Sequence, residues 1–545
     1  DVVDAVADLL DTVLASATAQ CPVTELLRPG RADQDFLAQH AAGPRRVIEP
    51  VTVDAMLRQA ASRAGQHRAV VICDPHGREQ TCWTYAQFDA QVNRLTRELL
   101  AHGVATGDRV LVVTGRVAQL PVALAAVLRA GACYVPVDPA FPVRRIRAMT
   151  DDADPCLVLL AGPAPRDPDS YGTVPLLDLD CPEVIARVQA RGSDAVAPQE
   201  LTRPLTGEDG CYLIYTSGST GQPKGVLNHH RGVANHLQWY GQTFLQGRCA
   251  RVLHKAPVTF DVGLAELLHP LSSGGTAVLP CSQWWQADVA ALVNMVAEQR
   301  IQVLSLVPSY LRVILDTVED PGRMRCLEQL LLGGEAVPGN LATRARDLLG
   351  CRVHSLYGPT EAAMDVTGVE FTPELAVAAG ENLIGRPEDN VTVRLLDRYG
   401  HEVPVGVPGE LCLVGVQVAD GYRNLPEETA AAFGVSPIEA DGGARMYRTG
   451  DIASWRRDGQ LVYHGRIGEQ VKVRGNRVEL GEVEAALLEV PGLAGPARRI
   501  PGVVPGAPPG DRRGAADHGP AGAELPSGRG HRGALSLAAE LPRQT

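Results

Sequence analysis

Strand and helix patterns alternate along the first third of this chain, and the alternation limits the folds that it can adopt. Short apolar runs rich in β-branched residues lie at 69–73 (AVVIC), 109–113 (RVLVV) and 133–137 (CYVPV). Segments with helical apolar spacing separate these runs, at 85–103 and 118–131. A helix at 288–300 and a strand at 301–308 resume the pattern later. Because parallel strands need long crossover connections, the sequence predicts an α/β fold with a parallel sheet.

Composition excludes several classes of protein. A chain of 545 residues has room for two to four domains. The net charge of −12 argues against nonspecific binding of nucleic acid. The twelve cysteines, from Cys21 to Cys412, contain no C-x-x-C and no zinc spacing, which predicts buried thiols in a reducing cytoplasm. We find no signal peptide and no membrane-spanning run, so we do not expect a membrane as a partner. Because of the net negative charge, we do not expect nucleic acid as a partner either. The chain begins at Asp1 rather than Met, so we expect it to be a piece of a longer protein.

A glycine-rich loop follows an apolar strand predicted at 211–215. The string YTSGSTGQPKGV (215–226) offers hydroxyl donors, flexible backbone and one positive charge, a combination that suits a polyphosphate. Its spacing is neither that of the Walker loop nor that of the dinucleotide-binding loop. Composition alone would also allow a flexible surface loop. The residues are Thr216, Ser217, Gly218, Ser219, Thr220, Gly221, Lys224 and Gly225.

The whole string resembles the phosphate loop of the adenylate-forming (AMP-binding) enzymes, a superfamily of acyl-CoA ligases, luciferases and nonribosomal peptide synthetase adenylation domains. Further strings resemble motifs of this family in the same order. They are CWTYAQFDAQVNRL (82–95), LRAGACYVPVDPAFPVRRI (128–146), FDVGLAELLHPL (260–271), LLGGEAVP (331–338), SLYGPTEAAMD (355–365), GELCLVGVQVADGYRN (409–424), MYRTGD (446–451) and YHGRIGEQVKVRGNRVELGEVEAAL (463–487). The resemblance spans about residues 50–490. It implies a large N-terminal domain of stacked α/β subdomains and a small C-terminal α+β subdomain, incomplete here.

The resemblance implies ATP and Mg²⁺ as ligands and assigns residues to them. Lys224, Thr360, Glu361, Arg466 and Lys472 would be catalytic, with Glu361 as the Mg²⁺ contact, because Mg²⁺ prefers one or two carboxylates plus phosphate oxygens. Tyr357 would stack on adenine, and Asp451 would bind the ribose. The nucleotide-binding set comprises Thr216, Ser217, Gly218, Ser219, Thr220, Gly221, Lys224, Gly334, Glu335, Ala336, Tyr357, Gly358, Thr360, Asp451, Tyr463 and Arg466.

A second set of residues would contact the other substrate. In the resemblance Asp261 pairs with the α-ammonium group of an amino acid, and we favour this role over that of a helix N-cap because the motif lies in register with the others. Asp365 and Ser305 are polar within an apolar set, so we expect a polar or basic substrate side chain, unless Asp365 bonds only to neighbouring backbone. The aligned residues are Asp261, Val262, Ala265, Ser305, Leu331, Gly333, Leu356, Met364 and Asp365.

The resemblance divides the chain into four parts. Residues 1–49 resemble the end of an upstream condensation domain with a polar, turn-rich linker, 50–464 the large subdomain, and 465–493 the hinge with the start of the small subdomain. Residues 494–545 form a tail with 10 glycines and 8 prolines among 52 residues, which predicts disorder. Two departures from the family are Gly468 at the hinge and the absence of the late catalytic lysine, since Lys472 is the last lysine. We hypothesise a frameshift or truncation near residue 490.

The implied function is that of a nonribosomal peptide synthetase adenylation domain. It activates an amino acid with ATP, releases pyrophosphate, and passes the aminoacyl group to a phosphopantetheine thiol. The partners would be a peptidyl carrier domain and an upstream condensation domain, and such domains sometimes need a small activating protein. An acyl- or aryl-CoA ligase is the alternative enzyme, against which Asp261 speaks. A catalytically impaired nucleotide-binding module without the late lysine motif is the alternative from another class.

Overall fold

The computed structural model describes residues 28–218, 223–281, 288–375, 377–378, 380–467, 470–473, 476–479 and 483; of residues 471–473 and 476–478 it describes the backbone alone. Contacts within the chain separate residues 1–491 from residues 492–545, and every described residue belongs to the first unit. The predictions for residues 1–27, for Gly468 and for the tail from 494 therefore lie outside the described residues.

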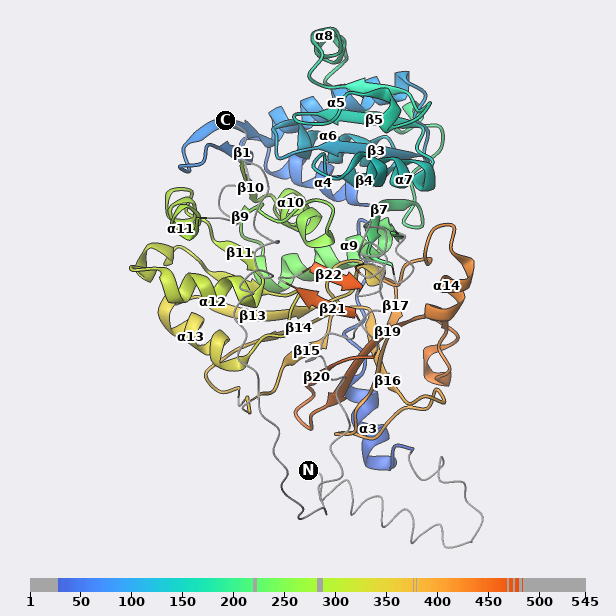
Figure 1. The fold of residues 1–545 in the computed structure, drawn as a ribbon, viewed down its shortest axis with the longest axis vertical. Helices are drawn as coiled ribbons and strands as arrows, with labels where there is room; N and C mark the ends of the chain where they lie inside the picture. Colours follow the sequence, from blue (N-terminus) through green and yellow to red (C-terminus); the bar gives the residue numbers. More distant parts are fainter. Residues whose placement is uncertain are drawn as a thin grey trace, which may run out of the picture. The chain divides into compact units, whose positions relative to one another are not determined.

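A six-stranded sheet carries the glycine-rich loop (Figure 1). Its order is β6-β5-β3-β4-β7-β8, and all neighbours are parallel except β7 and β8. The carboxyl ends of β3, β4 and β7 therefore meet at one edge, where ligands of α/β proteins bind. The strands are β3 (Arg109–Thr114), β4 (Cys133–Val137), β5 (Leu157–Ala161), β6 (Leu176–Asp178), β7 (Gly210–Thr216) and β8 (Lys224–His229).

A second sheet of fourteen strands supplies the rest of the site. Its centre is parallel, in the order β1-β10-β9-β11-β12-β13, and its other neighbours are antiparallel. The strands are β1 (Arg68–Cys73), β2 (Glu79–Thr84), β9 (Arg251–Leu253), β10 (Thr276–Pro280), β11 (Val303–Leu306), β12 (Gln329–Leu332), β13 (Arg352–Tyr357), β14 (Thr367–Glu370), β15 (Leu383–Pro387), β16 (Val391–Leu396), β17 (Gly409–Gly415), β18 (Phe433–Val435), β19 (Arg445–Trp455) and β20 (Leu461–Arg466). A separate hairpin, β21 (Gln470–Val473) and β22 (Asn476–Glu479), follows.

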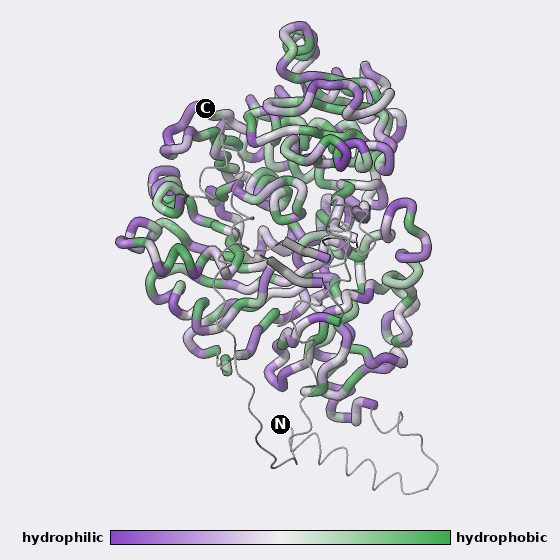
Figure 2. Tube along the Cα trace, in the orientation of Figure 1, coloured by the Kyte–Doolittle hydropathy of each residue, from purple (hydrophilic) through white to green (hydrophobic). Residues whose placement is uncertain are grey.

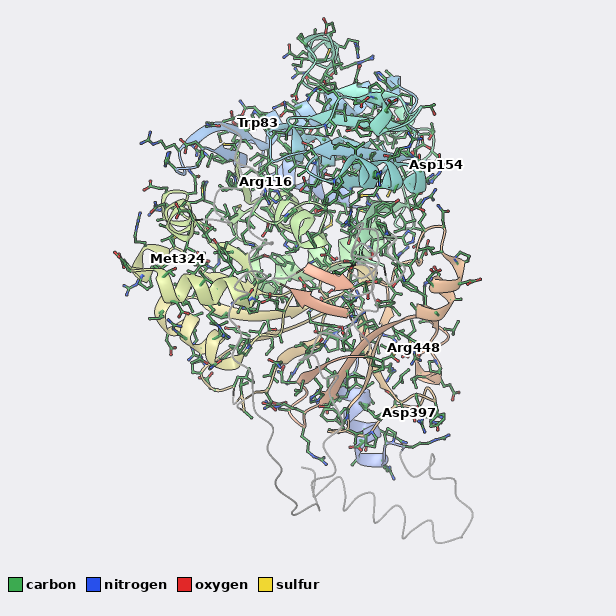
Figure 3. All side chains as sticks on the ribbon, in the orientation of Figure 1. Trp83, Arg116, Asp154, Met324, Asp397 and Arg448 are labelled. Carbon is green, nitrogen blue, oxygen red and sulfur yellow. The ribbon has the colours of Figure 1, made fainter. Side chains whose placement is uncertain are left out.

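Helices form the layer between these sheets. The largest apolar core joins α4, α5, α6 and α10 to strands of both sheets, and Figure 2 shows the hydrophobic character of the inner strands and helices. Near this layer Arg116, which follows β3, donates to the main-chain carbonyl of Lys255 (Figure 3). The helices are α3 (Arg31–His40), α4 (Val53–Arg63), α5 (Tyr85–Ala101), α6 (Gln119–Arg129), α7 (Val143–Ala153), α8 (Pro182–Ala190), α9 (His230–Tyr240), α10 (Asp261–Ser273), α11 (Val289–Glu298), α12 (Pro308–Thr317), α13 (Gly339–Leu349) and α14 (Pro426–Ala432).

The predicted alternation is confirmed element by element, and the mixed α/β architecture is as expected. One detail of the pairing differs from a single parallel sheet. β3 and β4 are parallel neighbours, but β1 pairs with β10, which lies about 200 residues later in the chain. Local periodicity identifies a strand, whereas its partner depends on the long-range packing of α5 against both sheets.

The prediction of a turn-rich linker before residue 47 was wrong for residues 31–40, which form α3. Leu37 is buried in the core of the β15–β20 region, and the ring of Phe36 meets Trp455 edge-on at 6.1 Å. The following backbone continues the docking, since the Gly43 N–H donates to the Val391 carbonyl at 2.8 Å. The helix is mostly polar, and its few apolar side chains give a weak sequence signal.

A buried ion-pair network fixes the helical layer. Arg129, at the end of α6, is 2% exposed and pairs with Asp54 of α4 at 2.9 Å and with Asp89 of α5 at 2.7 Å. Its guanidinium also donates to Asn93 at 2.7 Å. The charge of the arginine lowers the pKa of Asp54 against the opposing effect of burial. Asp54 also pairs with Arg58 at 2.6 Å, so removing Arg129 leaves the buried Asp54 with one counter-charge instead of two.

We predict that Arg129→Met lowers the free energy of unfolding by about 3–5 kcal/mol, because Asp54 and Asp89 lose their shared buried counter-charge and Asp54 keeps only Arg58. Denaturant unfolding of the full chain measures this. The control is Arg147→Met, which removes an exposed pair with Asp151 and is expected to cost less than about 0.5 kcal/mol. Equal losses in both variants would contradict the prediction.

Candidate active site

The glycine-rich loop joins two antiparallel strands. Thr216 ends β7, Lys224 begins β8, and the two residues are paired in the ladder, with the Thr216 hydroxyl donating to the Lys224 carbonyl at 3.4 Å. Lys224 thus lies at the start of a strand rather than on a helix, so no helix dipole assists its charge. Ser217 and Gly218 are described; Ser219, Thr220 and Gly221 lie outside the described residues.

Tyr422 connects the lysine of this loop to Glu361. The Lys224 Nζ lies 5.1 Å from the centre of the Tyr422 ring, and the Tyr422 hydroxyl donates to Glu361 Oε1 at 2.8 Å. The backbone fixes this geometry, since Val226 forms a bridge with Tyr422 and the Arg423 N–H donates to the Gly225 carbonyl at 2.8 Å. Sequence reasoning treated this segment as scaffold and missed Tyr422. The only signal was an aromatic residue beside Arg423 in a motif of the family.

The donor set around Glu361 fits Mg²⁺ held together with phosphate oxygens. Glu361 is fully buried, and within the described ranges no group of three or more His, Cys, Asp or Glu side chains forms a protein cage for a metal. A single carboxylate with phosphate ligands is the arrangement that Mg²⁺ accepts most readily. Lys224, across Tyr422, supplies the positive charge that a polyphosphate needs.

The turn between β13 and β14 brings the candidate residues together. A Cβ on Gly358 would lie 1.8 Å from the Met364 carbonyl oxygen, so only glycine fits there. Ala363 and Met364 adopt positive φ values of 51° and 83°, a strained conformation for residues with side chains. The Gln417 amide nitrogen holds the turn by donating to the carbonyls of Ala362, Ala363 and Asp365, at 3.3, 3.3 and 2.9 Å. Gln417 is a second residue that the sequence did not reveal.

The residues predicted to hold adenine and ribose also converge. The Tyr357 hydroxyl donates to Asp451 Oδ2 at 2.6 Å, and Arg466 pairs with Asp451 Oδ1 at 3.1 Å. Asp451 and Arg466 are opposite each other on β19 and β20. The rings of Tyr357 and Tyr463 are 6.3 Å apart. Of Lys472, the structure describes only the backbone, in β21.

Glu335 has a structural partner that the sequence did not predict. Its two carboxylate oxygens accept from the Ser309 N–H and from the Ser309 hydroxyl, each at 2.9 Å, at the first turn of α12. This arrangement satisfies an N–H of the helix terminus. Gly334, with φ of 77°, and Ala336 flank it after β12. The nucleotide-binding role of Gly334, Glu335 and Ala336 stays a prediction. Because the Glu335 carboxylate is already hydrogen-bonded to Ser309, we expect the main chain of this segment to make any contact with a nucleotide.

Asp261 is not the N-cap of α10, because Phe260 occupies that position and Asp261 is the first helical residue. Its carboxylate accepts from the Val262 N–H at 2.8 Å. Burial raises the pKa of Asp261, the Glu361 carboxylate adds to this effect, and the nearby Thr360 side chain and the Val262 N–H oppose it. A carboxylate in such a place gains from a positive partner.

The other predicted substrate residues lie on parallel strands of the large sheet, on α10 and in the 358–365 turn. Ser305, Leu331 and Leu356 lie on the adjacent parallel strands β11, β12 and β13, and Ser305 and Leu331 are directly paired. The remaining residues lie after β12 (Gly333), on α10 (Val262, exposed, and Ala265, buried) and in the 358–365 turn (Met364, Asp365). The predicted set is therefore drawn from neighbouring elements around α10 and the turn.

Asp365 is a carboxyl group in an unfavourable setting. Burial raises its pKa to about 7, the carboxylates of Glu388 and Asp261 add to this effect, and His236 opposes it. Within the part of the chain that the structure describes, no group donates a hydrogen bond to its side chain. The alternative that Asp365 only bonds to neighbouring backbone is therefore not favoured; it is the main-chain carbonyl of Asp365 that Gln417 holds.

Comparisons with known proteins agree with this geometry. The sequence pattern of the AMP-binding enzyme family matches residues 57–423. The phosphinothricin tripeptide synthetase PhsB of Streptomyces viridochromogenes is 38% identical over 487 residues, which are 88% of this chain and 39% of that protein. This chain thus spans about two fifths of that relative's length.

Two solved structures share the fold. The structure of a holo four-domain nonribosomal peptide synthetase bound to AMP and glycine matches with a TM-score of 0.71 and 30% identity, over 89% of this chain and 34% of that one. A holo protein containing adenylation and PCP domains, bound to a vinylsulfonamide inhibitor, matches with a TM-score of 0.68 and 26% identity, over 84% and 74%. The alternative of a CoA ligase finds no support among these relatives. Within the described residues, no helix combines the length and apolarity needed to cross a bilayer.

The raised pKa of Asp365 predicts a pH-dependent cost in stability. A carboxyl group with a pKa of 3.8 when unfolded and about 7 when folded is neutral in both states at low pH, and it destabilises the fold progressively as pH rises between these values. We expect Asp365→Asn to raise the free energy of unfolding of the ligand-free chain by about 1–3 kcal/mol at pH 8 and to have little effect at pH 4.

Denaturant unfolding at a series of pH values measures this gain. Asp458→Asn, at an exposed position, is the control and should change stability little at any pH. A gain for Asp365→Asn that does not grow with pH would contradict the assignment of Asp365 as the strained group.

Proposed function

This chain belongs to the AMP-binding enzyme family, as an adenylation domain of the nonribosomal peptide synthetase type, and we propose that it activates an α-amino acid with a polar or basic side chain. The carboxylate of the amino acid attacks the α-phosphate of ATP, and aminoacyl-AMP and pyrophosphate are the products. A phosphopantetheine thiol on a peptidyl carrier domain then takes the aminoacyl group and releases AMP. An upstream condensation domain would use that group, and a small activating protein remains a further candidate partner.

One observation carries the proposal. The Thr360 side chain is near enough to Asp261, the carboxylate suited to an α-ammonium group, to oppose the rise of its pKa. Thr360 is adjacent to Glu361, which Tyr422 connects to Lys224. The groups for the ammonium, the metal and the phosphates are therefore linked through one short turn, as alignment of a carboxylate with the α-phosphate requires.

The chain's own residues position the reactants and neutralise charge. Asp261 would orient the amino acid through its α-ammonium group, and Lys224 would balance the charge of the departing phosphates. Thr360 can donate to a phosphate oxygen, and Asp451 can accept from ribose hydroxyls beside Arg466. Mg²⁺ on Glu361, when bound, would neutralise charge on the pyrophosphate.

A second candidate is a nucleotide-binding module with little or no turnover. The observation in its favour is that no lysine follows Lys472, whereas the family resemblance implies a late catalytic lysine. Amino-acid-dependent exchange of pyrophosphate into ATP separates the two candidates. Exchange supports the adenylating enzyme, and ATP binding without exchange for any amino acid supports the module. A requirement for CoA in AMP formation would instead favour a CoA ligase.

We predict that Asp261→Asn raises the KM for the amino acid by about 100-fold and changes the KM for ATP by less than about threefold, because it removes the counter-charge of the ammonium group alone. Pyrophosphate exchange measures both constants. The desamino analogue of the substrate provides the matched control, since only the wild-type chain should discriminate strongly against it. Unchanged discrimination in Asp261→Asn would contradict the assigned role.

We also predict that Tyr422→Phe raises the Mg²⁺ concentration needed for half-maximal ATP binding by about tenfold, because Glu361 loses the hydroxyl that orients it. Binding of a fluorescent ATP analogue in excess EDTA should change less than about twofold, since the ring beneath Lys224 remains. Tyr422→Leu removes both contacts and should weaken binding with and without Mg²⁺. Equal Mg²⁺ dependence in wild type and Tyr422→Phe would exclude a role of the hydroxyl.

A further inference from the structure

Three buried ionisable side chains form a continuous chain behind the candidate substrate residues. The His236 Nδ1 lies 3.3 Å from Glu388 Oε2, and the His236 Nε2 lies 3.0 Å from the Nε2 of His269. His236 and Glu388 are fully buried, and His269 is 5% exposed. The imidazole of His269 stacks on Tyr240, with ring centres 3.3 Å apart and planes inclined by 12°. His236 and Glu388 lie outside the strings that resemble family motifs, and the proposed reaction uses none of the three groups.

The geometry gives each of the two histidines a charge state. Glu388 raises the pKa of His236 against the effect of burial, whereas burial with the charge of His236 lowers the pKa of His269 well below its usual range. A protonated His236 can donate to Glu388 from one nitrogen and to a neutral His269 from the other. His236 and Glu388 together then carry no net charge.

This pair adjoins Asp365. The Glu388 N–H donates to the carbonyl of Val366, the next residue after Asp365, at 2.9 Å. The ionisable groups whose charges act on the pKa of Asp365 are His236 from α9, Glu388 after β15 and Asp261 from α10, and the charge of Asp365 in turn raises the pKa values of Tyr212 and Tyr240. His236 is thus the only one of the three charged groups with a positive charge, and it is already paired.

A purely structural explanation of the pair is incomplete. Buried ion pairs usually contribute little net stability compared with apolar side chains of the same volume. Apolar side chains of α9 and α10 share one core and Tyr240 stacks on His269, and these contacts could hold the helices together without charges. The pair places the His236 imidazolium near Asp365, and the Glu388 carboxylate balances the charge of that imidazolium.

When these charges are paired, the Asp365 carboxylate is left without a positive partner. His236 balances Glu388, and the α-ammonium group of a bound amino acid would balance Asp261, so the negative charge of Asp365 has no counterpart among the groups that face it. A hydroxyl group can donate to Asp365 but cannot balance its charge, whereas an amine or guanidine does both. Small residues, Ala265 and Gly333, and the apolar side chains of Leu331, Leu356 and Met364 suit the methylene groups of a long side chain.

We propose that the substrate is an α-amino acid with a basic side chain held by Asp365, and that His236 and Glu388 are positioning residues which keep Asp365 as the one unbalanced charge. This inference rests on the proposed function and narrows its substrate class from polar or basic to basic. It also assigns a role to two residues that touch neither ATP nor the reacting carboxylate.

Binding of nonreactive aminoacyl-adenylate analogues tests the substrate class without requiring turnover. We would measure the Kd of 5′-O-sulfamoyladenosine conjugates of lysine and arginine, and of the neutral comparators norleucine and serine, on the full chain at pH 7.5 by calorimetry. We expect the lysyl or arginyl conjugate to bind at least about tenfold more tightly than the norleucyl conjugate, which lacks only the terminal charge of lysine. A norleucyl or seryl conjugate that binds as tightly as both basic ones would overturn the inference.

Variants of the pair test the positioning role through the ratio of the norleucyl to the lysyl Kd. In Glu388→Gln, Asp365 and Asp261 are the remaining carboxylates that favour protonation of His236, so at pH 6.5 we expect His236 to compete with the substrate for Asp365 and this ratio to fall about tenfold below that of wild type. The double variant Glu388→Gln with His236→Gln removes both charges, and we expect it to recover most of the preference. His354→Gln is the matched control, since it alters a buried histidine that hydrogen-bonds Gln329 and does not face Asp365.

The outcomes separate the inference from the proposed function. A ratio in Glu388→Gln equal to that of wild type, or no recovery in the double variant, would show that the pair is merely structural. Pyrophosphate exchange with neutral amino acids alone would overturn the substrate class and leave the proposed activity intact. No exchange with any amino acid, beside preferential binding of the basic conjugates, would remove the activity and support the inferred pocket.

Discussion

The turn at residues 358–365 is the constraint on which the rest of this site depends. Gly358 permits a backbone approach that any Cβ would block, and Gln417 holds three carbonyls of the turn in place. Groups from several elements meet at this turn. Thr360 opposes the rise of the pKa of Asp261, Glu361 accepts from the Tyr422 whose ring lies against Lys224, and the carbonyl of Val366, next to Asp365, accepts from the Glu388 N–H. A small displacement of the turn would therefore misalign several groups at once, which explains why two residues in strained conformations are tolerated there.

The same region concentrates charges that do not favour folding by themselves. Asp261 and Asp365 both have raised pKa values, and Glu388 does as well, because burial opposes their ionised forms. The ion pairs of Arg129 differ from this region, because Arg129 is balanced by Asp54 and Asp89 and holds α4, α5 and α6 together. Around the 358–365 turn, compensation is incomplete among the described residues. Incomplete compensation of this kind is typical of sites that are completed by ligands.

Much of the fold was predictable because local periodicity and motif order carry it. The strands at 109–113 and 133–137 and the helix between them appear as expected, and the candidate residues Tyr357, Asp451 and Arg466 meet in space. Failures occurred where the outcome depends on distant partners. The polar helix α3 gains its stability from Trp455, more than 400 positions away, and the pairing of β1 with β10 depends on the helical layer.

The site shows the same division. Most residues predicted to contact ligands fall within recognisable strings, whereas the sequence gives no local sign of a role for Tyr422, Gln417 and His236. Tyr422 follows a strand of the large sheet, Gln417 precedes it by five positions, and His236 is on a helix of the core. Only the folded backbone brings them to the 358–365 turn.

Motifs therefore identify the reaction that a site supports. Long-range packing, in contrast, brings together the groups that set the charge balance of the site and with it the proposed choice of substrate. For this chain the distinction is practical, because the proposed substrate binding involves described residues such as Asp261 and Asp365, whereas the family resemblance places the lysine expected for turnover in a later part of the chain. Binding and catalysis can accordingly be measured as separate properties of the same chain.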